Sequence, residues 1–355
     1  MQPLNIAILG YGRSGSTLHA DAIEKRPEFQ ITAVCDINDE KLDQARTRFN
    51  CRTYRDYHRM LANEDLDIVS VVTRSDQHCR MTCDCLDAGV SVLVTKPWAV
   101  DAREAERMVA HADANDKHLL PWLPARKDPL FLRLREHIRS GSIGDVFCVR
   151  HTISGFAKRY DWQTEQQYGG GYLLNWGPHI VDTGVLVTGR EPKTAHAWMR
   201  QVITPGDTED VFFADLEMDN GVHVLAERTV AVRGLPEWIV QGDHGTIIAN
   251  GRDLTLHAGP PTSPEDPTNH ASMQAAEPTT TQESVTGVRW GSAVDIYGEV
   301  AGTLHGNSKF PVTTADALAL TRLLDTIRAS SKTGQTMKTE GCSAYAVHKS
   351  QRSTA

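Results

Sequence analysis

The chain opens with a regular alternation of short apolar runs and helical patterns, which limits the possible fold more than any other feature. Five runs rich in β-branched residues predict strands: LNIAILG, FQITAVCD, LDIVSVVT, VSVLVTK and, more weakly, HLLPWL. Helical patterns lie between them, such as STLHADAIEKRP, DEKLDQARTRF and DAREAERMVAHADAND. Strands that alternate with helices form a parallel sheet covered on both faces, so we predict a doubly wound α/β domain over residues 1–122.

A glycine-rich turn follows the first predicted strand. The segment GYGRSG places Gly10, Gly12 and Gly15 as G-x-G-x-x-G between a strand and a helix, the context in which this pattern binds a dinucleotide. Gly10 permits the tight turn, Gly12 lets a pyrophosphate approach the backbone, and Gly15 lets the helix pack closely on the strand. Arg13 and Ser14 are candidate phosphate ligands or, alternatively, exposed loop residues.

The second predicted strand ends at Asp36, at the distance from the glycine turn that suits a ribose ligand. A carboxylate there can accept hydrogen bonds from both ribose hydroxyls and would repel a 2′-phosphate, which favours NAD over NADP. The alternative is that Asp36 caps the helix that follows it.

After LPWLPAR the pattern changes to a helix with Asp128 as N-cap, Pro129 in its first turn and Gly141 past its end. Short, often alternating runs then predict a largely antiparallel, open-faced sheet, within an α+β domain over residues 123–340. The segment 258–288 is poor in apolar residues and predicts a long loop. A closing helix, TADALALTRLLDTIRASSKTG, precedes a poorly ordered tail over residues 341–355.

Charge and composition exclude several classes of protein. The formal net charge of −8 argues against a nucleic-acid surface, which needs a basic patch. No apolar run approaches the length of a membrane span. The N-terminus passes straight into a strand pattern without a signal peptide, so we predict a cytoplasmic protein.

The seven cysteines form no disulfide framework. Cys79, Cys83 and Cys85, with His78 beside them, raise the question of a metal site. No second Cys/His pair follows at a suitable spacing, so buried thiols on a helix are favoured and no metal is expected.

The segment GGGYLLNWGPHIVD places two polar residues in an otherwise apolar run. Asn175 and His179 are four residues apart, so on a helix they share one face. The glycines just upstream indicate a place where backbone approaches another group closely. An amide and an imidazole side by side are suited to hydrogen-bonding a hydroxyl group.

Four stretches together resemble the Gfo/Idh/MocA family, the sugar and inositol dehydrogenases related to glucose–fructose oxidoreductase. They are GYGRSG, VTKPWAV, GGGYLLNWGPHIVD and TADALALTRLLDTIRASSKTG, which span almost the whole chain in the family's order. The resemblance implies a Rossmann domain plus an open-faced α/β domain, NAD(P) as cofactor and a sugar or polyol as substrate. It also implies a homodimer or homotetramer formed through the open sheet.

Within this resemblance, Thr95-Lys96-Pro97 occupies the place of the family's Glu-Lys-Pro. Lys96 then matches the active-site lysine, and it follows a parallel strand, where such sheets bind ligands. His179 matches the family's histidine and is the predicted general base, because imidazole titrates near working pH. Asn175 stands where aspartate is usual and is predicted to orient a substrate hydroxyl.

These motifs give the predicted site. The residues predicted to bind the cofactor are Gly10, Gly12, Arg13, Ser14, Gly15, Asp36, Thr73, His78, Lys96 and Pro97. Those predicted to bind the substrate are Lys96, Arg126, Asn175, Trp176 and His179, and those predicted to be catalytic are Lys96, Asn175 and His179.

The sequence departs from the family pattern at three places. Thr95 and Asn175 replace two acidic residues, and in the stretch TRSDQH Arg74 and Ser75 replace a proline and an asparagine. One hypothesis is an unusually cationic pocket suited to a sugar acid, since arginine can clamp a carboxylate. The alternative is neutral drift, with Arg74 pointing to solvent. Trp176 is a candidate for stacking on a sugar ring, or a plain core aromatic.

Three functions follow from these features. The leading one is an NAD-dependent dehydrogenase acting on a secondary hydroxyl of a sugar, cyclitol or derivative. A second is redox-assisted glycoside cleavage, which would release an aglycone without accumulating NADH. A third is a regulator that binds NAD and a sugar without turnover, against which the retention of Lys96 and His179 counts.

Overall fold

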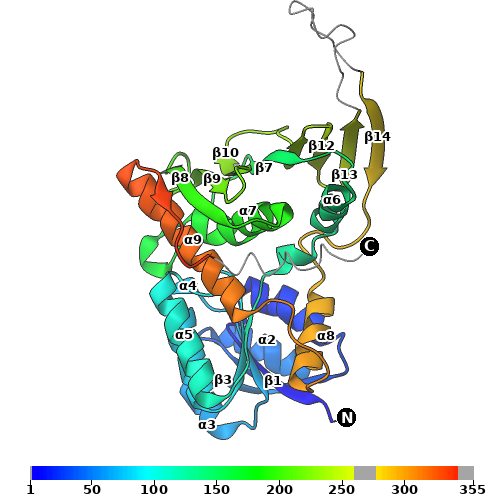
Figure 1. Ribbon diagram of the computed structural model, residues 1–355. Helices are drawn as coiled ribbons and strands as arrows, with labels where there is room; N and C mark the ends of the chain where they lie inside the picture. The colour runs from blue at the N-terminus through cyan, green and yellow to red at the C-terminus, as the bar shows by residue number, and fades with distance from the viewer. Residues whose placement is uncertain (1, 260–276, 343–355) are drawn as a thin grey trace, which may run out of the picture.

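The computed structural model describes residues 2–259 and 277–342, which form two α/β parts stacked on each other (Figure 1). The N-terminal part is built on a parallel sheet, and the C-terminal part on a wider, mostly antiparallel sheet. No helix in the described part of the chain is long and apolar enough to span a membrane.

The first sheet has six parallel strands in the order β3-β2-β1-β4-β5-β6. Its strands are β1 Leu4–Leu9, β2 Phe29–Cys35, β3 Arg52–Tyr54, β4 Ile68–Val71, β5 Ser91–Val94 and β6 Leu119–Pro121. Its helices are α1 Ala20–Ile23, preceded by a π-helical turn over Gly15–His19, then α2 Asp39–Phe49, α3 Tyr57–Asn63, α4 Ser75–Asp87 and α5 Ala102–Asn115. This is the predicted doubly wound domain, and the strand order reverses between β1 and β4, where such sheets bind ligands.

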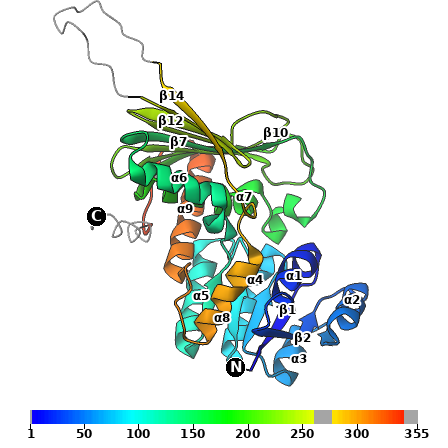
Figure 2. The same ribbon diagram turned by 90° about the vertical axis from the view of Figure 1, so that its right-hand side faces the viewer.

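The second sheet has nine strands in the order β14-β13-β12-β11-β7-β10-β9-β8-β15. They are β7 Val146–Gly155, β8 Pro192–Arg200, β9 Val211–Met218, β10 His223–Val230, β11 Trp238–Gly242, β12 Gly245–Asn250, β13 Asp253–Ala258, β14 Thr279–Ser284 and β15 Met337–Lys338. Helices α6 Pro129–Ser140, α7 Tyr172–Thr188 and α9 Thr314–Thr333 lie on the face toward the first sheet (Figure 2). Within residues 2–259 and 277–342, the opposite face carries no helix, as predicted.

Local sequence signals fix the ends of the main helices. Asp128 accepts hydrogen bonds from the first amides of α6, and Gly141 ends that helix with a φ of +72°. Thr313 and Asp316 form a capping box that begins α9. These helix boundaries confirm the sequence prediction for α6 and place the closing helix where its pattern indicates.

Three features differ from the sequence prediction. Part of the predicted loop 258–288 is a strand, β14, which pairs with β13; residues 260–276 of that loop lie outside the described residues. Polar, threonine-rich strands at a sheet edge lack the apolar alternation that marks a strand. Strands β7 and β10 pair in parallel, so the second sheet is mixed. Of the predicted tail, residues 343–355 also lie outside the described residues.

Helix α8, Ala293–Leu304, returns to the first part of the molecule. Its residues Ile296, Tyr297 and Val300 are buried in the same core as residues of β1 and α1. The predicted domain boundary between residues 122 and 123 therefore does not separate the two parts completely, because α8 lies after it in the sequence but packs in the core of the first part.

Candidate active site

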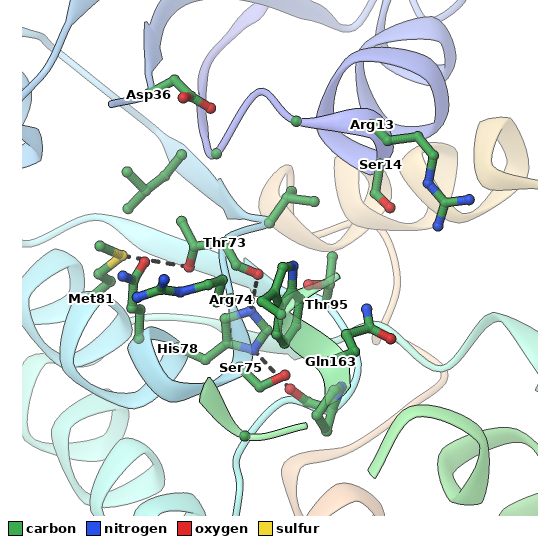
Figure 3. A pocket seen from close by; sticks show the side chains of 18 of the residues that line it. Arg13, Ser14, Asp36, Thr73, Arg74, Ser75, His78, Met81, Thr95 and Gln163 are labelled. Atoms are coloured by element: carbon green, nitrogen blue, oxygen red, sulfur yellow. Dashed lines mark hydrogen bonds between the residues drawn. The ribbon is translucent and has the colours of Figure 1, made fainter. Parts of the chain in front are cut away.

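A cleft of about 750 Å³ lies at the carboxyl ends of the first sheet. One side of the cleft is formed by residues that follow β1, β2, β4 and β5. The other side is formed by residues between 159 and 175 of the second part, from the loop before α7 and the first turn of α7. Figure 3 shows Asp36 at one end of this cleft and Gln163 at the other. Of the residues predicted to bind the cofactor, nine line the cleft: Gly10, Gly12, Arg13, Ser14, Asp36, Thr73, His78, Lys96 and Pro97.

Two glycines of the turn differ in the space around them: Gly12 is open toward the cleft, whereas Gly15 is packed against backbone. A Cβ on Gly15 would lie 2.1 Å from the carbonyl oxygen of Gly10, so this glycine is needed for packing and does not line the cleft. A Cβ on Gly12 would meet nothing within 4 Å, and Gly12 faces the cleft. The open backbone at Gly12 is the feature that a dinucleotide pyrophosphate requires, so the site fits NAD(P).

These two glycines give a matched pair of variants. We expect Gly15→Ala to lower the free energy of unfolding by about 1–3 kcal/mol, because the new methyl group overlaps backbone. We expect Gly12→Ala to keep the parent thermal midpoint but to weaken NADH binding about tenfold or more, because its Cβ takes the space of the pyrophosphate. Calorimetric melting and NADH fluorescence titration measure the two effects. Equal destabilisation by both variants would contradict this division of roles.

Asp36 is held in place by two backbone amides. The amide of Tyr11 donates to Oδ2 at 2.6 Å and the amide of Asn38 donates to Oδ1 at 2.9 Å. The N-cap of α2 is Asn38, so Asp36 does not cap that helix and the alternative interpretation is wrong. Its carboxylate is therefore fixed at the rim of the cleft, where a ribose ligand is expected.

Lys96 bridges the two parts of the molecule. Its Nζ donates to the side-chain Oδ1 of Asn175 at 2.6 Å and to the backbone oxygen of Asn175 at 2.8 Å. Lys96 follows β5 and Asn175 lies in the first turn of α7, so the two predicted catalytic residues meet although they are far apart in sequence. The peptide bond between Lys96 and Pro97 is cis.

The charge on Lys96 has little support from its surroundings. Burial, together with the positive charges of Arg159 and Arg13, lowers the pKa of Lys96 to about 7. The two positions that could supply a carboxylate are neutral: Thr95 donates to the backbone oxygen of Val71, and Asn175 offers an amide. A lysine with this pKa can accept a proton near neutral pH.

His78 supports the turn that carries Lys96. Its ring nitrogens lie 2.7 Å from the backbone oxygen of Pro97 and 3.0 Å from that of Thr73. The ring therefore ties the end of β4 to the end of β5, beside the cleft. The nearby thiols Cys79 and Cys83 are buried on α4, and no cluster of three or more metal-binding side chains occurs in the described ranges.

His179 lies one helical turn beyond Asn175 but does not line the cleft, as far as the described residues define it. The rings of Trp176 and Trp290 pack around it, with centroids 6.1 and 5.2 Å away. Burial lowers the pKa of His179 well below its usual value, and the charge of Lys96 lowers it further. Its Nδ1 is buried without a hydrogen-bond partner among the described residues.

Arg126 does not belong to the cleft, contrary to its prediction as a substrate ligand. Its guanidinium donates two hydrogen bonds of 2.8 Å to Asp182 of α7 and lies 3.3 Å from Asp316 of α9. The guanidinium of Arg126 is therefore engaged by these two carboxylates and does not face a substrate in the cleft. The family resemblance placed an arginine here but could not show which partner it meets.

Several cleft residues escaped the sequence prediction. Among them are His19, Trp122, Arg159, Asp161 and Gln163. Arg159 to Gln163 lie between β7 and the glycines before α7, in a segment without a recognisable motif. The family pattern gave no signal there, because loops that approach a ligand from a second domain vary in sequence.

Comparisons with known proteins agree with this fold. The model described as "Oxidoreductase family, NAD-binding Rossmann fold" matches residues 4–121, and the "GFO/IDH/MocA C-terminal domain" matches residues 131–248. The scyllo-inositol 2-dehydrogenase (NADP(+)) IolW of Bacillus subtilis is 24% identical over 350 residues, covering 95% of this chain and 96% of that protein.

Solved structures share the whole fold. An NAD-binding protein from Listeria innocua superposes with a TM-score of 0.82 at 22% identity, covering 98% of this chain and 99% of that one. The WlbA dehydrogenase from Bordetella pertussis, solved with NADH and UDP-GlcNAcA, gives 0.79 at 19% identity, covering 95% and 98%.

The fold and cleft thus define a two-domain oxidoreductase that binds NAD(P) in a Rossmann domain. The chain belongs to the Gfo/Idh/MocA family.

Proposed function

We propose that this protein is an NAD-dependent dehydrogenase acting on a secondary hydroxyl of a sugar, cyclitol or sugar derivative. The observation that carries the proposal is the contact of Lys96 with Asn175 in the same cleft as the glycine turn and Asp36. A lysine with a pKa of about 7 beside the cofactor cleft supplies the proton acceptor that alcohol oxidation needs.

The chemistry that bound NAD supplies is acceptance of a hydride from the substrate carbon. Lys96 takes the proton of the same hydroxyl group, and Asn175 holds the lysine Nζ toward the cleft through its amide oxygen. We propose Lys96 as the first proton acceptor in preference to His179, because Lys96 lines the cleft, whereas neither His179 nor Trp176, whose ring packs against it, does so. Asn175 and His179 remain proposed catalytic residues that position the reacting groups.

NAD is the proposed cofactor, with Asp36 as the determinant. Relatives differ in this respect: the IolW name specifies NADP(+), whereas the WlbA structure contains NADH. A fixed carboxylate at the ribose position favours the cofactor with free hydroxyls.

We expect Asp36→Ala to lower kcat/KM for NAD about 10- to 100-fold, because hydrogen bonds to a charged group are lost. The value for NADP should rise, because the repulsion of the 2′-phosphate disappears. Asp43→Asn is the control, since Asp43 is exposed and pairs with Arg46, and neither residue lines the cleft. A parent enzyme that prefers NADP, or an unchanged preference in Asp36→Ala, would reject Asp36 as the determinant.

The function is tested by incubating the protein with NAD and a panel of sugars, cyclitols, sugar acids and aryl glycosides. Formation of NADH with one substrate class supports the dehydrogenase. Release of an aglycone without net NADH would indicate glycoside cleavage, and tight NADH binding without either product would indicate a regulator.

The proposed assembly is a homodimer or homotetramer through the open face of the second sheet. Large side chains stand exposed there: Trp198 is 46% exposed and Phe213 41%. The rings of Trp198 and Phe213 lie 5.6 Å apart on the adjacent strands β8 and β9. Such an apolar patch favours contact with a second copy.

A further inference from the structure

The cleft is lined by more cationic than acidic side chains. The described cations that line the cleft are Arg13, Arg55, Arg74, Arg80, Lys96 and Arg159, whereas the described carboxylates there are Asp36, Asp56 and Asp161. Asp36 and Asp56 accept hydrogen bonds from backbone amides and lie away from Lys96, at the ends of β2 and α3. A dinucleotide brings two phosphate charges, for which Arg13 and the adjacent helix amides are placed.

Arg159 is the cation that the cofactor does not account for. It comes from the second part of the molecule, and its side chain is 20% exposed. Its Nε lies 3.4 Å from Asp161, whose own side chain is 50% exposed, and its Nη1 donates to Gln163. Its remaining nitrogen, Nη2, makes no hydrogen bond within the part of the chain that the structure describes.

The positive charge of Arg159 acts on two other cationic side chains. The charge of Arg159 lowers the pKa of both Lys96 and Arg228. Arg228 is 5% exposed and its Nε is buried without a hydrogen-bond partner among the described residues. Of the carboxylates on this side, Asp161 pairs weakly with Arg159, and Glu209 accepts the amide of Leu173 at the start of α7. Asp210, whose charge raises the pKa of Arg228, accepts the backbone amides of Ile203 and Thr204.

Arg74, which the sequence singled out as an added charge, does not play this part. It pairs with Asp76 at 3.3 Å and lies over the ring of Tyr168, 4.0 Å from its centroid. The charge of Arg74 is therefore balanced by an ion pair and a ring, whereas Arg159 has an ion pair only with the more exposed Asp161.

We propose that the substrate carries an anionic group, a carboxylate or a phosphate, and that Arg159 binds it; this inference rests on the proposed function. A guanidinium with a free nitrogen can form charge-assisted hydrogen bonds to such a group. When Lys96 takes the hydroxyl proton it becomes an ammonium ion near Arg159, and a negative charge on the substrate offsets the resulting repulsion. A neutral sugar leaves that repulsion in place.

The test compares three probes with one ring: glucose, glucuronate and glucose 6-phosphate, with the corresponding galactose compounds as a second series. Binding to the NADH complex is measured by calorimetry, and turnover with NAD by NADH formation. We expect one anionic probe to bind at least tenfold more tightly than the neutral sugar with the same ring. In Arg159→Gln we expect the affinity for that anionic probe to fall about 10- to 100-fold. The carboxylate and phosphate arms distinguish the two kinds of anion.

Lys158→Gln is the matched control, because Lys158 is the exposed neighbour of Arg159 and does not line the cleft. We expect it to change the ratio between anionic and neutral probes less than about twofold, since exposed charges are screened by solvent. Arg159→Lys keeps the charge and should retain part of the preference.

Equal or better use of the neutral sugars would overturn the inference and leave the dehydrogenase proposal standing. An anion preference unchanged in Arg159→Gln would overturn the assignment to Arg159. Failure of every probe, in an enzyme that oxidises a neutral cyclitol of the wider panel, would overturn the inference and leave the proposed function standing. Failure of the whole panel, although NADH binds, would overturn both.

Discussion

Replacement of Lys96 by Met is expected to lower kcat about 10²- to 10⁴-fold, the usual contribution of a positioned acid–base group. The Met side chain has a comparable length but cannot accept a proton. NADH binding should persist, because the glycine turn and Asp36 lie on other strands. Single-turnover hydride transfer and NADH fluorescence separate the two effects.

The pH profile tests the same residue by a second route. Since burial and nearby arginines lower the pKa of Lys96 to about 7, the neutral amine becomes abundant as the pH rises through that value. We therefore expect kcat/KM for oxidation to rise with pH, with a midpoint near 7. His179, whose pKa is well below its usual value, should add no step in this range.

Two variants separate a proton acceptor from a fixed cation. Lys96→Arg keeps the charge but does not lose a proton at these pH values, so it should be nearly as inactive as Lys96→Met. Asn175→Asp places a carboxylate against Nζ and should move the midpoint to higher pH. An active Lys96→Arg enzyme, or a profile that falls as pH rises, would show that Lys96 acts as a cation.

Replacement of Arg126 by Met is expected to lower the free energy of unfolding by about 3–5 kcal/mol, because it leaves buried carboxylates without their cation. The side chains of Arg126, Asp182 and Asp316 are 9%, 0% and 6% exposed. The guanidinium connects the turn after β6 with α7 and α9, so its loss affects the packing of the second part on the first. Denaturant unfolding followed by tryptophan fluorescence measures the change.

The control for Arg126 is Arg103→Met. Arg103 pairs with Asp101 at 3.0 Å, but its side chain is 91% exposed, and we expect no measurable loss of stability. A stable Arg126→Met protein with a raised KM for substrate would instead support the substrate role that the sequence suggested.

The regular parts of the fold were predictable because their signals are local. The strand runs, the helix spacing and the glycine turn each involve neighbouring residues, and together they predict the parallel sheet and its cofactor edge. Caps such as Asp128 act within one turn of their own helix. Strand β14 and helix α8 were missed, because β14 is polar at a sheet edge and α8 follows a segment read as loop.

Local patterns in the sequence suffice to place Lys96 after one buried parallel strand and Asp36 after another. The four-residue spacing of Asn175 and His179 puts them on one helix face. The tertiary structure alone decided their partners. In the folded protein Lys96 contacts Asn175, and Arg126 pairs with the carboxylates of Asp182 and Asp316. Arg159, from a loop without a recognisable motif, lines the cleft. The physical reason is range: periodicity and turn chemistry act between neighbours, whereas charge pairing and burial depend on how distant segments pack.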